Sequence, residues 1–296
     1  MNATPSRSES FTDSVGGEAP ERSIGDIIRQ TRNLKARQVE KILAYQREHG
    51  VRFGEAAVAL KLASPDDVVY ALAQQFRYPY APEEERERSP ELVALNQPFS
   101  AQAEAFRALR SQLISRVFQA GDTPRALAVI SAEAQDGKSF FAANLAVVLS
   151  QLGGRTLLVD ANLRAPRQHE IFNLESRAGL SAILAGRSRT RVIQQVDFLP
   201  GLYVLPVGVV PPNPLELIER SSFGMMLREL GGKFDHVVVD TPAACFGADP
   251  VVIAARAGAA VVVARQHTSR LDPLQDLVAQ VSATPAKLAG LVMNSY

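Results

Sequence analysis

The sequence VISAEAQDGKSF, at residues 129–140, decides the fold of the larger part of this chain. Apolar residues 127–130 have the composition of a buried strand, and the alanine-rich run at 141–149 has that of a helix. Between them, the tripeptide Gly-Lys-Ser occupies 137–139. A strand, a loop ending in Gly-Lys-Ser and a helix are the context of a phosphate-binding loop, whose backbone N–H groups hold an anion at the helix N-terminus. The stretch therefore predicts a nucleoside triphosphate site.

Each residue of the tripeptide has an expected role in that site. Gly137 lets the backbone approach the phosphates, because it has no Cβ. Lys138 would reach the outer phosphates, and the Ser139 hydroxyl would bind Mg²⁺. The pattern is imperfect, since Ala132 stands where the usual loop has its first glycine and two acids lie within an anion-binding loop. On the tripeptide alone, a chance Gly-Lys-Ser at a strand–helix turn is an alternative.

Composition limits the classes of protein that fit. The 296 residues are enough for one large or two modest domains, and the net charge of +1 gives no basic field for nucleic acid or an anionic membrane. The single cysteine, Cys245, excludes an intrachain disulfide framework and fits the cytoplasm. Residues 1–21 are polar, so we expect a disordered tail rather than a signal peptide. No apolar run approaches the ~20 residues of a membrane span, so membrane association would require a partner.

Residues 22–80 contain an internal repeat, in which 23–26 aligns with 52–55 and both copies have glycine at the third position. Each copy predicts a short helix followed by a longer one, the longer helices lying at 36–46 and 65–75. Repetition of a helical unit suggests two halves that bury each other's apolar faces. A single irregular helical bundle is the alternative.

The closing sequence of this segment, LAQQFRYPY at 72–80, resembles the N-terminal domain of type II secretion ATPases, also called the MshE N-terminal domain. Some members of that family bind cyclic di-GMP through a duplicated motif that begins Arg-Leu-Gly and ends in Gln. Positions that match the two copies are Gly25, Gln38, Gln46, Arg52, Gly54 and Gln75. Positions that depart from the motif are Ser23, Arg32, Lys61 and Asp67. An acid facing a bis-phosphate is unfavourable, so we expect protein docking or a structural role rather than cyclic di-GMP binding.

The rest of the chain predicts one α/β domain. Residues 81–99 are charged and contain prolines, which indicates a linker, and a helical pattern begins at 101. Near-continuous apolar strands then alternate with helical stretches, as in a doubly wound, mostly parallel sheet. The strand candidates are 127–131, 156–160, 202–207, 236–240, 259–264 and 288–294. We therefore expect a P-loop NTPase fold at 100–296, preceded by the small helical domain.

Two acids turn the loop into a more complete site. Asp160 and Asp240 each end a predicted buried strand, at the sheet edge where ligands bind in open α/β folds. A Mg²⁺–nucleotide site needs an acid near the metal, directly or through water. One Asp at a strand end could be a simple cap, but two beside a phosphate loop predict ATP and Mg²⁺ as cofactors.

Residues 100–296 resemble the cytoplasmic domain of bacterial tyrosine kinases, the BY-kinases of capsule and exopolysaccharide assembly. Three nucleotide-binding motifs carry the resemblance, in the family's order. They are the Walker A-like loop at 131–139, the A′-like sequence DANLR at 160–164 and the Walker B-like DTP at 240–242. LYVLPVG at 202–208 and PPNPLEL at 211–217 also match the family's pattern. Together with the N-terminal segment, the chain further resembles the EpsG-type chain-length determinant kinases.

The resemblance implies an ATP-dependent protein-tyrosine autokinase that regulates polymer length. Its partner would be the cytoplasmic segment of a membrane polysaccharide co-polymerase, which would hold it at the inner membrane. The implied catalytic residues are Lys138, Asp160 and Asp240, and the implied metal-binding residues are Ser139, Asp160 and Asp240. The expected nucleotide contacts are Glu133, Ala134, Gln135, Asp136, Gly137, Lys138, Ser139, Phe140, Arg164 and Asn294.

A further family motif, E-x-x-R-x-x-R, falls on Glu104, Arg107 and Arg110. The resemblance assigns these residues to contacts between subunits of a homo-oligomeric ring. Their spacing places them along one side of a helix. The alternative is an ion-paired, solvated helix face within one subunit.

Two departures from the family pattern bear on catalysis. Asn162 replaces the second A′ aspartate, and an amide cannot act as a base and binds Mg²⁺ weakly. Asp160 is then the better candidate base and Asp240 the better acid on the metal side. The family's terminal tyrosine cluster is reduced to Tyr296, the candidate phosphoacceptor. An ATP-bound scaffold with weak or no kinase activity is therefore an alternative. A partition-type ATPase of the ParA/MinD class is another, although Glu133 stands where that class has its signature lysine.

Overall fold

The computed structural model describes residues 23–75, 89–118, 126–187 and 192–295. The chain divides into two compact units, Met1–Tyr78 and Pro79–Tyr296, which are described separately. The expected tail at 1–21, the first part of the expected linker and Tyr296 lie outside the described residues.

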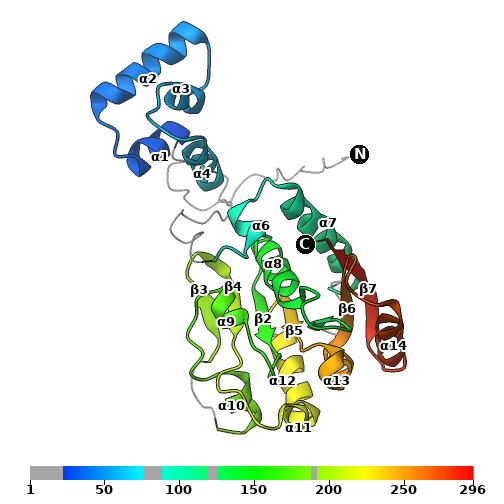
Figure 1. Ribbon diagram of the computed structural model, residues 1–296. Coiled ribbons are helices and arrows are strands. Elements are labelled where there is room, and N and C mark those ends of the chain that lie inside the picture. The colour runs from blue at the N-terminus through cyan, green and yellow to red at the C-terminus, as the bar shows by residue number, and fades with distance from the viewer. Residues whose placement is uncertain (1–22, 76–88, 119–125, 188–191, 296) are drawn as a thin grey trace, which may run out of the picture. The chain divides into compact units, whose positions relative to one another are not determined.

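Over residues 23–75, the N-terminal unit has four helices in the short–long order that the repeat predicts (Figure 1). They are α1 (Ile24–Thr31), α2 (Ala36–His49), α3 (Phe53–Ala59) and α4 (Pro65–Gln75). One apolar cluster joins Ile28 of α1 to Ala71 of α4, and so joins the first half of the repeat to the second. The glycine of the second copy permits close packing, because a Cβ at Gly54 would lie 2.8 Å from a methyl carbon of Val68. The repeat therefore specifies helices that bury one another.

The second unit is built on a seven-stranded sheet with the order β3-β4-β2-β5-β1-β6-β7. Its strands are β1 (Ala126–Ile130), β2 (Thr156–Asp160), β3 (Gln194–Val196), β4 (Leu199–Leu205), β5 (His236–Asp240), β6 (Gly258–Arg265) and β7 (Lys287–Asn294). All neighbours run parallel except β3 and β4. The six predicted strands and the doubly wound fold are confirmed. The edge strand β3 was missed, because three residues that include two glutamines give no apolar run.

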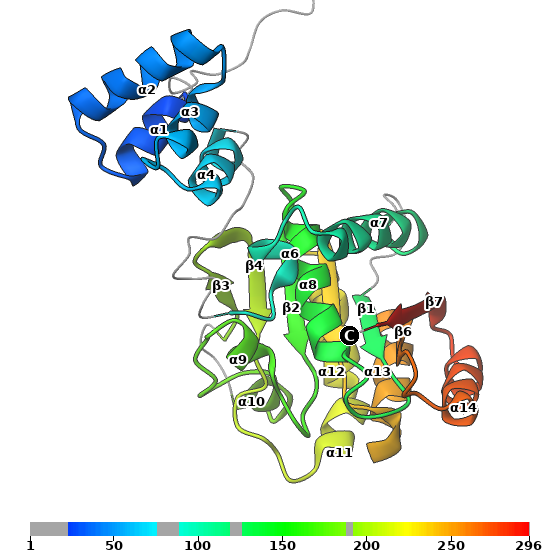
Figure 2. The same ribbon diagram turned by 45° about the horizontal axis from the view of Figure 1, so that its top comes forward.

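Helices cover both faces of the sheet (Figures 1 and 2). They are α6 (Val93–Asn96), α7 (Ala101–Arg116), α8 (Lys138–Ser150), α9 (Gln168–Ile171), α10 (Leu180–Leu184), α11 (Pro214–Glu219), α12 (Ser221–Gly231), α13 (Asp249–Ala257) and α14 (Leu271–Ser282), with a 3₁₀ turn at Ala244–Phe246. Leu127 and Val129 of β1 enter the core beneath α7 and α8, whereas Ala128 and Ile130 enter the core beneath α12 and α13. Burial on both faces explains why the central strands β1, β2, β5 and β6 read as continuous apolar runs. None of the described helices has the length and apolarity needed to cross a bilayer.

The second half of the expected linker is part of the α/β domain, so that prediction is wrong from residue 89 onward. Leu92 and Leu95, at α6, are buried in the core beneath α8. Asn144 of α8, itself fully buried, accepts a hydrogen bond from the Ala94 N–H and donates to the Glu91 carbonyl, each at 2.9 Å. The charged composition of 81–99 concealed this anchor, because it depends on a few apolar residues and on an asparagine distant in sequence.

Candidate functional site

The phosphate loop connects β1 to α8 through left-handed backbone. Gly137 has φ of 92°, and Gln135 has φ of 65°. A Cβ at residue 137 would lie 2.1 Å from Nδ2 of Asn294, which donates to the Asp136 carbonyl at 3.1 Å. Asn294 ends β7, so the structure brings this predicted nucleotide contact against the loop. Helix α8 therefore begins directly after a left-handed turn that glycine can adopt, with its N-terminus at the phosphate loop.

Lys138 closes the loop on itself. Its side chain is buried, with 7% exposed, and Nζ donates to Ser131 Oγ at 2.9 Å. Burial lowers the pKa of Lys138, whereas the neighbouring charges of Asp240 and Asp136 act in the opposite direction. The ammonium is therefore held inside the loop, beside the acids of the site, where phosphate oxygens would supply stronger partners than a hydroxyl.

Both acids of the phosphate loop form hydrogen bonds with residues from outside the loop. Asp136 is buried, and its carboxylate accepts from the Glu133 N–H at 3.1 Å and from Ser269 Oγ at 2.6 Å. Glu133 forms an ion pair with Arg270, whose Nε lies 2.8 Å from its carboxylate, and these hydrogen bonds lower the pKa of Glu133. The two hydrogen bonds of Asp136 stabilise the loop, and the ion pair with Arg270 offsets the negative charge of Glu133. Ser269 and Arg270 were not predicted, because nothing local relates them to a loop more than 130 residues earlier.

Asp160 and Asp240 meet at the carboxyl ends of β2 and β5, where they are directly paired in the register of the sheet. Both are fully buried. Asp160 accepts from the N–H groups of Asn162 and Arg167 at 3.1 Å and of Gln168 at 3.0 Å. Burial, and then the charge of Asp240, raise the pKa of Asp160 well above its usual range. Burial also raises the pKa of Asp240, whereas the neighbouring side chains of Ser139 and Gln168 act in the opposite direction.

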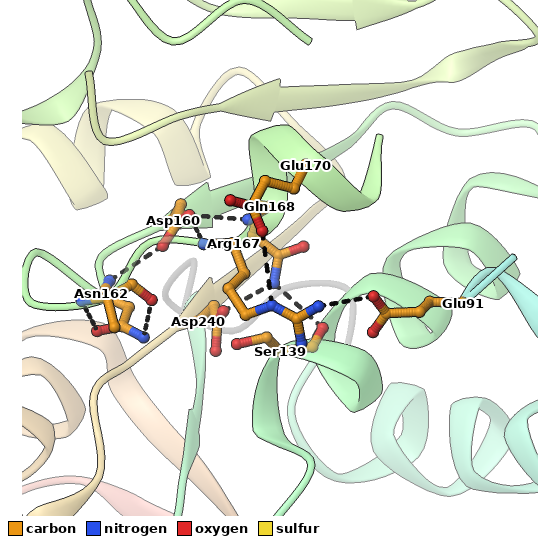
Figure 3. A network of polar contacts seen from close by, with 9 residues as sticks. Glu91, Ser139, Asp160, Asn162, Arg167, Gln168, Glu170 and Asp240 are labelled. Carbon is orange, nitrogen blue, oxygen red and sulfur yellow. Dashed lines mark hydrogen bonds and ion pairs between the residues drawn. The ribbon is translucent and has the colours of Figure 1, made fainter. Parts of the chain in front are cut away.

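Gln168 connects these elements, as Figure 3 shows. Its side-chain Nε2 donates to Oδ2 of Asp240 at 2.7 Å and to the backbone carbonyl of Ser139 at 3.1 Å. Gln168 follows the A′-like sequence at 160–164, and no role was predicted for it. A lone glutamine carries no signal in one sequence, because its contacts depend on how two other strands and a helix end meet.

The acids fit a Mg²⁺ ion that is shared with nucleotide phosphates. Oδ1 of Asp240 is buried and has no hydrogen-bond partner among the described residues. Such an oxygen is costly unless a cation or a donor approaches it. In the described part of the chain, no group of three or more His, Cys, Asp or Glu side chains could hold a metal ion by itself. Mg²⁺ in phosphoryl-transfer sites needs only one or two carboxylates beside phosphate oxygens and water.

Two residues of the A′ motif form hydrogen bonds or ion pairs away from the acid pair. Asn162 closes its own turn, because its amide donates to the Ala165 carbonyl at 2.7 Å and accepts from the Ala165 N–H at 3.1 Å. Arg164 forms a two-point ion pair with the fully buried Asp249 of α13, at 3.2 and 2.9 Å. An aspartate at 162 could not donate to Ala165, which is a structural reason for the amide. The nucleotide contact expected of Arg164 stays a prediction.

The three residues of the E-x-x-R-x-x-R motif lie on α7 and bond within the same chain. Arg107 forms an ion pair with Glu104 and donates to the Pro98 carbonyl. Arg110 donates to the Val148 carbonyl of α8 at 2.8 Å. Glu104 is largely exposed, whereas Arg107 is mostly covered. A role in contacts between subunits stays a prediction for all three.

The buried acid pair predicts how stability without nucleotide depends on pH. Because the pKa values of Asp160 and Asp240 are raised, the folded state binds protons more tightly than the unfolded chain. This contribution to the free energy of unfolding therefore falls as pH rises above about 4, the ordinary carboxyl pKa. We expect Asp240→Asn to lose less stability than the wild type between acidic and neutral pH, measured from urea midpoints. An equal or steeper loss in the variant would contradict the prediction.

Comparisons with known proteins place this site in a family. No protein-family model matches the chain. The putative tyrosine-protein kinase CapB of Staphylococcus aureus is 31% identical over 203 residues, which cover 69% of this chain and 88% of CapB. The chain belongs to the bacterial tyrosine-kinase family. The kinase domain of Escherichia coli tyrosine kinase ETK superposes with a TM-score of 0.65 at 29% identity, covering 69% of this chain and 79% of that domain. Membership decides against the partition-type ATPase alternative.

Other tyrosine kinases of the family are much longer than this chain. Tyrosine-protein kinase ptk of Acinetobacter johnsonii is 32% identical over 191 residues, which are 64% of this chain but 26% of ptk. The chain therefore spans about a quarter of that relative's length.

Proposed function

We propose that this protein is an ATP-dependent protein-tyrosine autokinase that regulates the polymerisation of an exopolysaccharide or capsule. The observation that carries the proposal is the meeting of the phosphate loop with two buried acids. Asp160 and Asp240 are paired across β2 and β5, and Gln168 links Asp240 to the first turn of α8. Membership of the tyrosine-kinase family supports this reading of the site.

The residues divide the chemistry between them. Lys138 and the loop N–H groups would hold the β- and γ-phosphates and stabilise the charge of the transition state. Ser139 and Asp240 would hold Mg²⁺, which when bound offsets phosphate charge. The bond between the γ-phosphorus and the bridging oxygen of ADP breaks, and a bond to the tyrosine oxygen forms. Asp160 would take the tyrosine proton as the general base.

The test is direct detection of the product. Purified protein is incubated with Mg–ATP, and phosphotyrosine is located by mass spectrometry, with and without the cytoplasmic segment of the co-polymerase. We expect phosphotyrosine on the chain, and Tyr296 is the proposed acceptor, so Tyr296→Phe should remove it. Absence of phosphotyrosine under both conditions would overturn the kinase proposal.

One observation favours a second function, an ATP-binding scaffold with weak or no kinase activity. Asn162 replaces an acid of the family motif, and both ends of its amide are occupied by Ala165. A site with one acid fewer could still bind Mg–ATP through Lys138 and Asp240. Binding of ATP without phosphotyrosine in the experiment above would support this second function.

The wider setting follows from the family resemblance. We place the protein in the cytoplasm, bound to the inner membrane through a polysaccharide co-polymerase, as in EpsG-type kinases. The N-terminal unit would serve docking in the manner of an MshE N-terminal domain. Asp67 supports docking over cyclic di-GMP binding, because this buried acid pairs with Arg32 at 2.7 Å and accepts from the Ser64 N–H at the start of α4. The position that would face a bis-phosphate is thus an acid fixed in place.

The proposed ring is tested on α7. We expect Arg107→Ala combined with Arg110→Ala to abolish a large nucleotide-dependent oligomer, because the family places these side chains between subunits. Light scattering with ADP or ATP measures the change. Arg116→Ala is the matched control, since Arg116 lies on the same helix and donates to the Ala289 carbonyl at 2.9 Å. A wild type that is monomeric with every nucleotide, or a double variant that retains the oligomer, would end the proposal.

A further inference from the structure

Gln168 is a buried polar residue with contacts to every nucleotide-binding motif of the site. It begins the short helix α9 and has no exposed surface. Its backbone N–H donates to Asp160, and its amide Nε2 donates to both Asp240 and the backbone of Ser139 (Figure 3). The A′ acid, the Walker B acid and the first turn of α8 are thus joined through one side chain and its own backbone.

The hydrogen bond to Asp240 fixes which carboxylate oxygen is left for a cation. Nε2 of Gln168 lies 2.7 Å from Oδ2 of Asp240, while Oδ1 is buried and has no hydrogen-bond partner among the described residues. When one carboxylate oxygen accepts a hydrogen bond and the other has no partner, the second oxygen is left in a fixed orientation as a ligand for a cation. Metal ligands commonly depend on such outer partners for their orientation and affinity.

The amide oxygen of Gln168 supplies a second, independent observation. Oε1 is buried and, like Oδ1 of Asp240, has no partner within the described structure. Buried amide oxygens are nearly always hydrogen-bonded, so an open one in the residue that holds Asp240 indicates a missing donor. Mg²⁺ retains several water molecules when it binds through one or two carboxylates, and each of them is a donor.

We propose that Gln168 is a positioning residue for Mg²⁺, which orients Asp240 through Nε2 and accepts a hydrogen bond from a metal-bound water through Oε1. The inference rests on the nucleotide site of the proposed function but not on phosphoryl transfer. It predicts that Gln168 governs the affinity for Mg²⁺ more than the affinity for the nucleotide itself.

The test measures binding of a fluorescent ADP analogue to the full chain across a Mg²⁺ titration and in EDTA. In Gln168→Met, which keeps the volume but removes both polar atoms, we expect the Mg²⁺ concentration for half-maximal effect to rise roughly 10- to 100-fold. Affinity in EDTA should stay close to that of the wild type. Gln195→Met is the matched control, because Gln195 is exposed and its amide donates to the Pro200 carbonyl.

A double-variant cycle separates positioning from a general structural role. If Gln168 acts through Asp240, then Gln168→Met should add little to the Mg²⁺ defect of Asp240→Asn. Gln168→Asn, which keeps an amide but shortens its reach, covers the case in which the Met variant fails to fold. An unchanged Mg²⁺ requirement, or fold-changes that multiply in the double variant, would overturn the inference. If the wild type binds the ADP analogue in a Mg²⁺-dependent manner and the variants show the expected defect, but no phosphotyrosine forms, the result counts against the kinase proposal alone.

Discussion

Replacing Lys138 with methionine is expected to reduce phosphotyrosine formation at least about 100-fold, as loss of one preorganised donor to a transition-state oxyanion does. Lys138 is the buried cation of the loop, and its Nζ is held by Ser131 at 2.9 Å, within reach of Asp240's charge. Methionine fills a similar volume without the charge. Quantitative mass spectrometry of the phosphorylated tyrosine measures the loss, and melting temperature with and without Mg–ADP reports folding and nucleotide binding.

The matched control for Lys138→Met removes a lysine elsewhere on the same domain. Lys233 is exposed and pairs with Glu229 at 2.6 Å after the end of α12, so Lys233→Met tests the loss of one positive charge outside the site. Activity of the control should stay near that of the wild type. If both variants retain phosphotyrosine formation, Lys138 does not stabilise the transferred phosphoryl group and the assignment of the loop fails.

Replacing Gly137 with alanine is expected to abolish detectable nucleotide binding and to lower the free energy of unfolding by about 1–3 kcal/mol. At φ of 92° a Cβ is strained, and here it would lie 2.1 Å from Nδ2 of Asn294. Asn294 would have to leave the Asp136 carbonyl, and the new methyl group would project where the loop meets β7. Calorimetry with Mg–ADP and urea denaturation measure the two effects.

A second glycine separates backbone strain from the local clash. Gly153 has a closely similar φ of 88°, but a Cβ there would meet nothing within 4 Å. Gly153→Ala should therefore lose a comparable amount of backbone stability and bind nucleotide normally. Equal nucleotide affinity in the two variants would show that the contact between Asn294 and the loop plays no part in binding.

Local sequence patterns were enough for most of the α/β fold. The central strands β1, β2, β5 and β6 were predicted because they bury both faces and so read as unbroken apolar runs. The loop was predicted because strand, Gly-Lys-Ser and α8 are contiguous. Asp160 and Asp240 were predicted to lie beside the loop because each ends a strand at the ligand-binding edge of the sheet, and the structure pairs them directly. The prediction failed at β3 and at residues 89–99. There, structure depends on two glutamines at a sheet edge and on Leu92 and Leu95 beneath α8.

The sequence by itself determined the strand–loop–helix at 129–149, the sheet and its two acids, since each follows from neighbouring residues and from periodicity. Only the tertiary structure decided how the loop's acids are held, because Ser269 and Arg270 reach Asp136 and Glu133 from the far end of the domain. It alone joined Gln168 to Asp240. Hydrogen bonds between side chains distant in sequence need the folded backbone to bring donor and acceptor within 3 Å, and one sequence carries no record of that approach.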